Sequence, residues 1–119
     1  MIVALLVMTL AGVIVVTLGW LGLQGKLPRN HVAGIRTPYT MRSDETWYAT
    51  HRHGGPILIF AGVAAVSAGL ALVPFAAAGA VSDSLTAATA LAMAAVLLMA
   101  ALGSWLIGTR RARAELEAR

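Results

Sequence analysis

The sequence contains no cysteine and few charged or aromatic residues. The lack of cysteine excludes disulfides, thiolate nucleophiles and cysteine-ligated zinc or iron–sulfur sites. Charged residues make up 12% of the 119 residues, against about 25% in an average soluble domain. Hydrophobic residues make up 59%, above the roughly 45–50% of soluble domains. This composition predicts a single membrane domain whose helices face lipid.

Three long apolar runs predict an all-α membrane protein with transmembrane helices at about residues 2–23, 56–75 and 85–108. The first run would reach about 33 Å as a helix, enough for a bilayer core of ~30 Å. It is also the place for a signal peptide, but no basic segment precedes it and no A-x-A cleavage site follows. We therefore expect it to be retained. None of the runs contains Asp, Glu, Lys, Arg or His, which argues against a pump or proton-coupled transporter acting alone.

The basic residues lie in two segments beside these runs. The connection 24–55 holds Lys26, Arg29, Arg36, Arg42 and Arg52, and the tail 109–119 holds four arginines. The N-terminus before the first run and the turn 76–84 hold neither Lys nor Arg. With three spans, the connection and the tail share one side, and the positive-inside rule places that side in the cytoplasm and the N-terminus outside. The net charge of +4 is therefore better explained by topology and anionic lipid than by direct nucleic-acid binding.

Helix ends and helix contacts follow from smaller features. Ser84 or Asp83 is expected to cap the third helix, which should continue into the tail 109–119, where Arg and Glu recur four residues apart. Small residues at fourfold spacing predict close helix contacts within the chain or in a homo-oligomer. An alanine-rich composition would also produce them by chance. They are Ala61, Ala65 and Gly69 in the second span and Thr86, Ala90 and Ala94 in the third.

Residues 30–55 hold all three histidines, both tyrosines and one tryptophan. Pro38 favours an extended Thr37, and Gly34 permits a turn that other residues resist. Arg36 is therefore expected to lie on a stiff, non-helical segment. From there its planar guanidinium could bind a carboxylate, a phosphate or a helix C-terminus. The alternative is an arginine that only sets topology.

Ser43 is expected to cap a short helix over about 44–53 that ends at the glycine–proline segment 54–56. On this helix Trp47 and His51 lie one turn apart and are expected to stack or pack together against the bundle. The helix would then lie on the inner membrane surface or fold under the spans. The alternative is an interfacial helix that Trp47 merely anchors.

The histidines do not predict a metal site. His31, His51 and His53 are close in sequence, but His51 and His53 diverge on a helix, no HExxH motif is present and no other histidine spacing converges. A catalytic pair of His51 with Ser43 or Asp44 lacks any nucleophile motif. We therefore expect no catalytic residue and no cofactor, with a lipid-acting membrane enzyme as the alternative.

Residues 30–55 resemble the signature loop of the SdpI family of bacterial membrane proteins. The resemblance extends over this loop and the hydrophobic frame beside it, and the spans add little identity. The positions that carry it are Asn30, Gly34, Ile35, Arg36, Thr37, Pro38, Tyr39, Thr40, Ser43, Trp47, His51, Gly54 and Gly55.

The resemblance implies a non-enzymatic, multi-pass protein of the bacterial cytoplasmic (inner) membrane. The family's namesake confers immunity to a secreted toxic peptide and recruits a repressor, so toxin immunity or membrane signalling through a bound partner is expected. The namesake has an additional N-terminal membrane half. The resemblance therefore supports partner binding by this chain better than it supports toxin immunity. The expected partners are the lipid bilayer, anionic lipid headgroups and a protein: a repressor, a toxin or a larger membrane complex. The alternative is a small accessory subunit of a transporter or envelope-biosynthesis complex.

The loop residues divide into two expected roles. Arg36 would contact an anion, and Trp47 and His51 would hold the short helix against the bundle. The residues expected to bind a partner or an anion are Arg36, Thr37, Tyr39, Thr40, Ser43, Trp47, His51 and Arg52. Those expected to shape the loop are Asn30, Gly34, Pro38, Gly54, Gly55 and Pro56.

Overall fold

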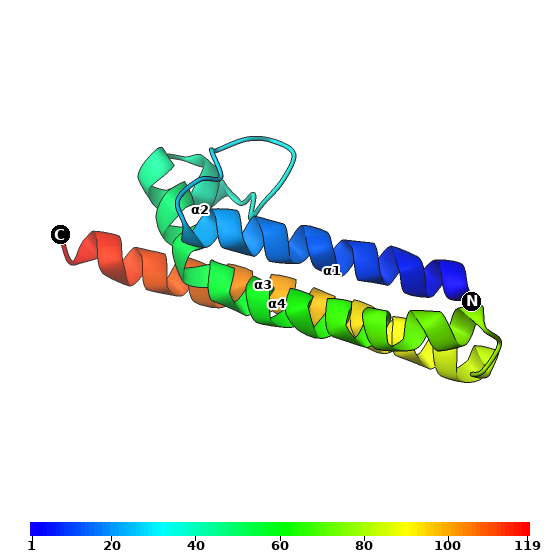
Figure 1. Cartoon of the computed structure of the whole chain (residues 1–119). Coiled ribbons are helices and arrows are strands. Elements are labelled where there is room, and N and C mark those ends of the chain that lie inside the picture. Colours follow the sequence, from blue (N-terminus) through cyan, green and yellow to red (C-terminus); the bar gives the residue numbers. More distant parts are fainter.

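The computed structural model describes residues 1–119 as four helices and no strand: α1 (Ile2–Leu23), α2 (Pro38–Met41), α3 (Asp44–Ala77) and α4 (Asp83–Glu117). The helices α1, α3 and α4 are each long and apolar enough to cross a membrane. They lie side by side in an elongated molecule of 57 × 20 × 19 Å (Figure 1). The all-α architecture, with three candidate spans and a short helix in the first connection, is confirmed.

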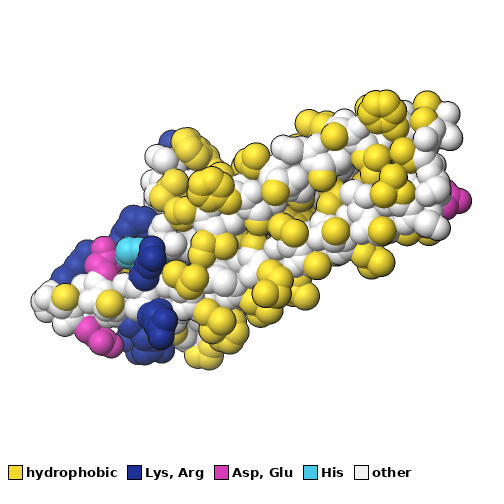
Figure 2. All heavy atoms as spheres, turned by 90° about the horizontal axis from the view of Figure 1, so that it is seen from below, with side chains coloured by type: hydrophobic (Ala, Val, Ile, Leu, Met, Phe, Trp, Pro, Cys, Tyr) yellow, Lys and Arg dark blue, Asp and Glu magenta, His cyan; other side chains and the backbone are white.

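The connection 24–55 and the C-terminal tail lie at the same end of the molecule (Figure 1). Lys and Arg side chains gather at that end (Figure 2). The parity expected from three spans is thus present. Which side of the membrane this end faces stays a prediction.

The central helix, α3, packs along both α1 and α4, which contact each other much less. Only 25 of the 119 residues are buried, and large hydrophobic side chains such as Phe60 remain exposed on the outer faces. A membrane bundle needs no larger core because acyl chains cover these faces.

Two glycine pairs set the approach of α1 and α3. A Cβ built on Gly55 would lie 2.6 Å from the carbonyl oxygen of Gly19, and one built on Gly19 would lie 2.8 Å from that of Gly55. Gly12 and Gly62 repeat this arrangement seven residues away, at 3.1 and 2.8 Å. Only glycine lets the two backbones approach so closely, and this contact replaces the hydrophobic driving force that helices lack in lipid.

The fourfold stripes of small residues are partly used inside the chain. Ala65 and Gly69 are buried, with Gly69 beside Thr9 of α1. On α4, Thr86 and Ala90 are buried. These positions mark contacts within the chain, while a homo-oligomer stays a prediction.

The helix expected over 44–53 does not end at 54–56. Instead, α3 continues unbroken through Gly54, Gly55 and Pro56 into the span. The two glycines cost helix stability locally, but Gly54 packs against Ser104 of α4 and Gly55 against α1. Pro56 removes one hydrogen bond of the helix ladder, which membrane helices tolerate. The short separate helix is α2 instead.

The start of α4 also differs from the expectation. Ser82, rather than Ser84 or Asp83, is the N-cap, and its hydroxyl accepts a hydrogen bond from the Leu85 N–H at 3.1 Å. The helix then runs for 35 residues to Glu117, so its predicted continuation into the tail is confirmed.

Candidate functional site

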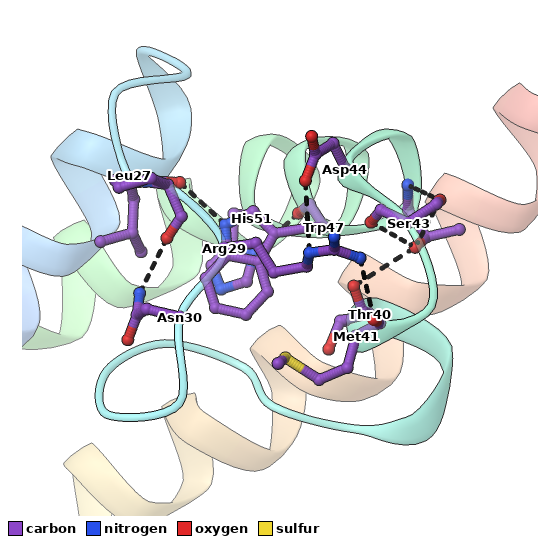
Figure 3. Close-up of polar contacts among 11 residues, drawn as sticks. Leu27, Arg29, Asn30, Thr40, Met41, Ser43, Asp44, Trp47 and His51 are labelled. Atoms are coloured by element: carbon purple, nitrogen blue, oxygen red, sulfur yellow. Dashed lines mark hydrogen bonds and ion pairs between the residues drawn. The ribbon is translucent and has the colours of Figure 1, made fainter.

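Trp47 and His51 lie side by side at the base of the loop, on the first turns of α3. Both are buried, and their ring centroids are 4.1 Å apart at an interplanar angle of 32°. The Trp47 indole N–H donates to the Leu27 carbonyl at 2.8 Å (Figure 3). This bond ties the chain leaving α1 to α3. The predicted packing of these two rings is confirmed.

Both ring nitrogens of His51 are used. Its Nε2 accepts a hydrogen bond from the Ile35 N–H at 2.8 Å, so this nitrogen carries no proton. Its Nδ1 lies 2.7 Å from the Trp47 carbonyl and therefore donates to it. Burial lowers the pKa of His51, and the bond to the Trp47 carbonyl offsets this only in part. His51 precedes the apolar run 56–75 and is a neutral, fixed imidazole.

Gly34 lies directly against this ring pair. Its φ of +108° is a conformation that favours glycine. A Cβ at this position would lie 2.7 Å from His51 Nε2 and 3.1 Å from the Trp47 ring. The turn expected at Gly34 is therefore present, and it lets the backbone N–H of Ile35 reach His51.

Two threonines fix α2. Thr37 is extended, at φ −120° and ψ 165°, as expected before Pro38. Its hydroxyl accepts from the Thr40 N–H at 3.2 Å, while the Thr40 hydroxyl accepts from the Thr37 N–H at 2.9 Å. The fully buried Thr40 hydroxyl also donates to the Ile35 carbonyl at 2.6 Å. This capping box holds the segment that follows the turn.

The start of α3 is held by polar side chains. The Ser43 hydroxyl accepts from the Thr46 N–H at 3.1 Å, which confirms Ser43 as the N-cap. Arg29 pairs with Asp44 at 3.2 Å and donates to the Met41 carbonyl at 3.0 Å (Figure 3). The loop is thereby attached to α3 on both sides of its tip.

Tyr39 joins α2 to the end of α4. Its side chain is buried, and the guanidinium of Arg113 lies 4.1 Å from its ring centroid, with that of Arg42 at 4.9 Å. Arginine over an aromatic face is an attractive cation–π arrangement. The sequence singled out Tyr39 but not Arg113, because nothing local connects residues so far apart.

An ion pair joins α3 to α4 below the loop. Arg52 Nη2 lies 2.7 Å from Glu115 Oε1, and His53 Nε2 lies 3.6 Å from Glu115 Oε2. Desolvation raises the pKa of the Glu115 carboxyl, but attraction to Arg52 and their hydrogen bond, with His53, hold it below its usual value overall. Glu115 thus pairs across helices with Arg52, whereas none of the Arg–Glu pairs expected four residues apart in the tail is formed.

The same helices, α3 and α4, also approach each other closely at Gly54. The buried Ser104 hydroxyl donates to the Gly54 carbonyl at 3.0 Å. A Cβ on Gly108 would lie 2.8 Å from the Thr50 carbonyl oxygen. Neither Ser104 nor Gly108 was singled out from the sequence. The signal that could have found them is their small size beside the large side chains of Leu102, Trp105, Leu106 and Ile107.

The tip of the loop, residues 30–36, carries exposed side chains. The Asn30 side chain accepts hydrogen bonds from the N–H groups of Val32 and Ala33, both at 2.8 Å. The Val32 side chain is 83% exposed. Arg36 is exposed and donates one hydrogen bond, to the His31 carbonyl at 2.9 Å.

The structure thus places the predicted binding residues in several different environments. Tyr39, Thr40, Trp47 and His51 are buried. Thr37 and Ser43 cap helices, Arg52 pairs with Glu115, and only Arg36 is exposed at the tip. No group of three or more His, Asp or Glu side chains is placed to hold a metal ion. The binding role of the eight residues stays a prediction.

Comparison with known proteins gives one match. The model of a family described as the SdpI/YfhL protein family matches residues 26–108, well over half of the chain. The matched range covers the loop, α3 and most of α4. No curated protein and no solved structure matches the chain.

Proposed function

The chain belongs to the SdpI/YfhL protein family, and from this we propose that it is a non-enzymatic bacterial membrane protein that binds a partner through the tip of its first connection. The binding serves immunity to a toxic or antimicrobial peptide, or membrane signalling. The proposed orientation places residues 24–55 and the tail in the cytoplasm and the N-terminus outside the cytoplasmic membrane.

One observation carries this proposal. The loop is held at its base by hydrogen bonds that the buried side chains of Trp47, His51 and Thr40 make with its backbone, while Val32 and Arg36 remain exposed at its tip. A preorganised surface loses less conformational entropy on binding than a flexible arm.

Arg36 is the proposed contact. One of its N–H groups donates to the His31 carbonyl, and a guanidinium carries five. The remaining donors suit a carboxylate, which guanidinium binds in a planar, bidentate manner. The partner is therefore expected to present an acidic side chain beside a small apolar patch that meets Val32.

Two single substitutions test the contact. Arg36→Ala should lose the partner that copurifies in mild detergent and should lose protection against the toxic peptide. Lys26→Ala is the matched control, because Lys26 is an exposed basic residue near the start of the same connection, away from the tip. If Arg36→Ala retains both the partner and the protection at normal expression, the proposal fails.

The orientation has its own test, since the chain has no cysteine to remove. Val32→Cys and Ser84→Cys place single thiols at exposed positions at opposite ends of the bundle. A membrane-impermeant maleimide should label Ser84→Cys in intact cells and Val32→Cys only after lysis. The reverse pattern would refute the orientation.

An accessory subunit of a larger membrane assembly is a second candidate. It is favoured by a groove of about 460 Å³ between α1 and α4, lined by hydrophobic side chains such as Val7, Ala90 and Leu91. Such a groove suits a further transmembrane helix. A large complex that survives purification of Arg36→Ala would favour this candidate, whereas a homo-oligomer alone would count against it.

A further inference from the structure

A second groove lies at the other end of the bundle, between α2 and the end of α4. Its volume is about 690 Å³. The groove runs along α4 from Trp105 and Leu106, where the apolar run ends, to Arg110 and Arg113 in the tail. In this part of the molecule basic side chains lie directly beside hydrophobic ones (Figure 2).

The two halves of the groove differ in chemistry. Trp105 is 42% exposed and Leu106 56% exposed, so both present apolar surface at the membrane boundary. One turn further out, Arg110 is exposed and makes neither a hydrogen bond nor an ion pair within the chain. Arg113 is held in place over Tyr39. Between the halves, the Thr109 hydroxyl is buried without a hydrogen-bond partner.

We propose that this groove binds an anionic phospholipid, with the phosphate between Arg110 and Arg113 and an acyl chain along Trp105 and Leu106. Charge complementarity supports this occupant, because two arginines outnumber the single acidic residue of the groove, Glu117. Its position supports a lipid rather than a soluble anion, because the apolar half lies on the last turn of the apolar run 85–108 and the basic half lies directly beyond it. Basic groups at this depth attract anionic headgroups. The proposal uses neither the loop tip nor its partner and is independent of the proposed function.

Native mass spectrometry of the whole chain in neutral detergent tests it, with phosphatidylglycerol and phosphatidylcholine added in turn. Arg110→Gln should weaken phosphatidylglycerol binding about fivefold, the effect expected for one arginine at an anionic headgroup. Arg111→Gln is the matched control, because Arg111 is the exposed neighbour on the same helix that does not line the groove. Neither substitution should change phosphatidylcholine binding.

Fluorescence then locates the lipid. In a Trp20→Phe background, which keeps Trp47 and Trp105, brominated phosphatidylglycerol should quench the emission more than brominated phosphatidylcholine does, and the further change Trp105→Phe should remove this difference. Equal loss of binding in Arg110→Gln and Arg111→Gln would show a diffuse charge effect and overturn the proposal. Equal binding of the two lipids would also overturn it, as would displacement of phosphatidylglycerol by excess inorganic phosphate.

Discussion

Replacing Gly55 by alanine places a methyl group against the backbone of α1. The added Cβ would lie 2.6 Å from the Gly19 carbonyl oxygen and 3.2 Å from the Leu23 backbone nitrogen. Real Cβ atoms essentially never lie under 3.0 Å from another heavy atom, and both neighbours are backbone atoms that cannot rotate away. Helices α1 and α3 must therefore separate at this point.

The size of the effect follows from two opposing terms. Overpacking a well-packed site costs about 1–3 kcal/mol, whereas alanine is favoured over glycine inside a helix by about 0.8–1.0 kcal/mol. Gly103→Ala is the matched control, because the nearest atom to its added Cβ is Ile57 Cγ2 at 3.9 Å, an ordinary contact. Both variants gain the helix term, so the difference between them is the packing cost alone, about 1–3 kcal/mol.

The free energy of unfolding is measured by titrating sodium dodecyl sulfate into mixed micelles and following tryptophan fluorescence. The double variant Gly19→Ala/Gly55→Ala should lose less than the sum of the single variants, because one separation of the helices accommodates both methyl groups. Equal free energies for Gly55→Ala and Gly103→Ala would refute the role assigned to the glycine pairs.

Three further outcomes follow from the loop. Gly34→Ala should expose residues 28–36 to proteolysis, because the added Cβ would lie 2.7 Å from His51 Nε2. Gly25→Ala is the matched control: its φ of +69° is also positive, so it shares the backbone strain, but nothing lies within 4 Å of its Cβ and residues 28–36 should stay protected. Burial lowers the pKa of His51 below its ordinary 6.5. Below pH 6.5 the unfolded chain therefore binds a proton that the folded chain excludes. The free energy of unfolding should fall as the pH drops from 6.5 toward the lower pKa of the folded chain. His51→Gln, which keeps an acceptor for the backbone N–H, should reduce this slope in unfolding measured from pH 7.5 to 5, leaving the slope that the lowered pKa of Glu115 contributes at the acid end. An unchanged slope would refute the role of His51. Trp47→Phe removes the 2.8 Å bond to the Leu27 carbonyl and should destabilise the chain by about 1–3 kcal/mol, measured in the same titration; no loss would show that this bond is dispensable.

The three spans, the shared end of loop and tail, and the stacking of Trp47 on His51 could be predicted because they depend on local composition or on spacing within one helix. The extended Thr37 before Pro38 and the N-cap at Ser43 belong to the same class. These features are decided within a few residues of sequence, where proline geometry and helix capping act.

The errors arose where a distant residue decides the local structure. The segment 54–56 reads as a helix stop by propensity alone, yet it stays helical because Gly19 and Ser104 lie against its glycines. Arg113 over Tyr39 and Arg52 on Glu115 escaped prediction for the same reason. Their partners lie on another helix, and one sequence does not show which helix faces meet.

Glycine and proline are also the usual positions at which a long helix bends. In α3 this weak point is clamped on one side by Gly19 and on the other by Ser104, immediately beneath the Trp47–His51 pair. Separating α1 from α3 at Gly55 is therefore expected to let α3 bend at this point and to reorient the loop tip, although no residue of the tip itself changes.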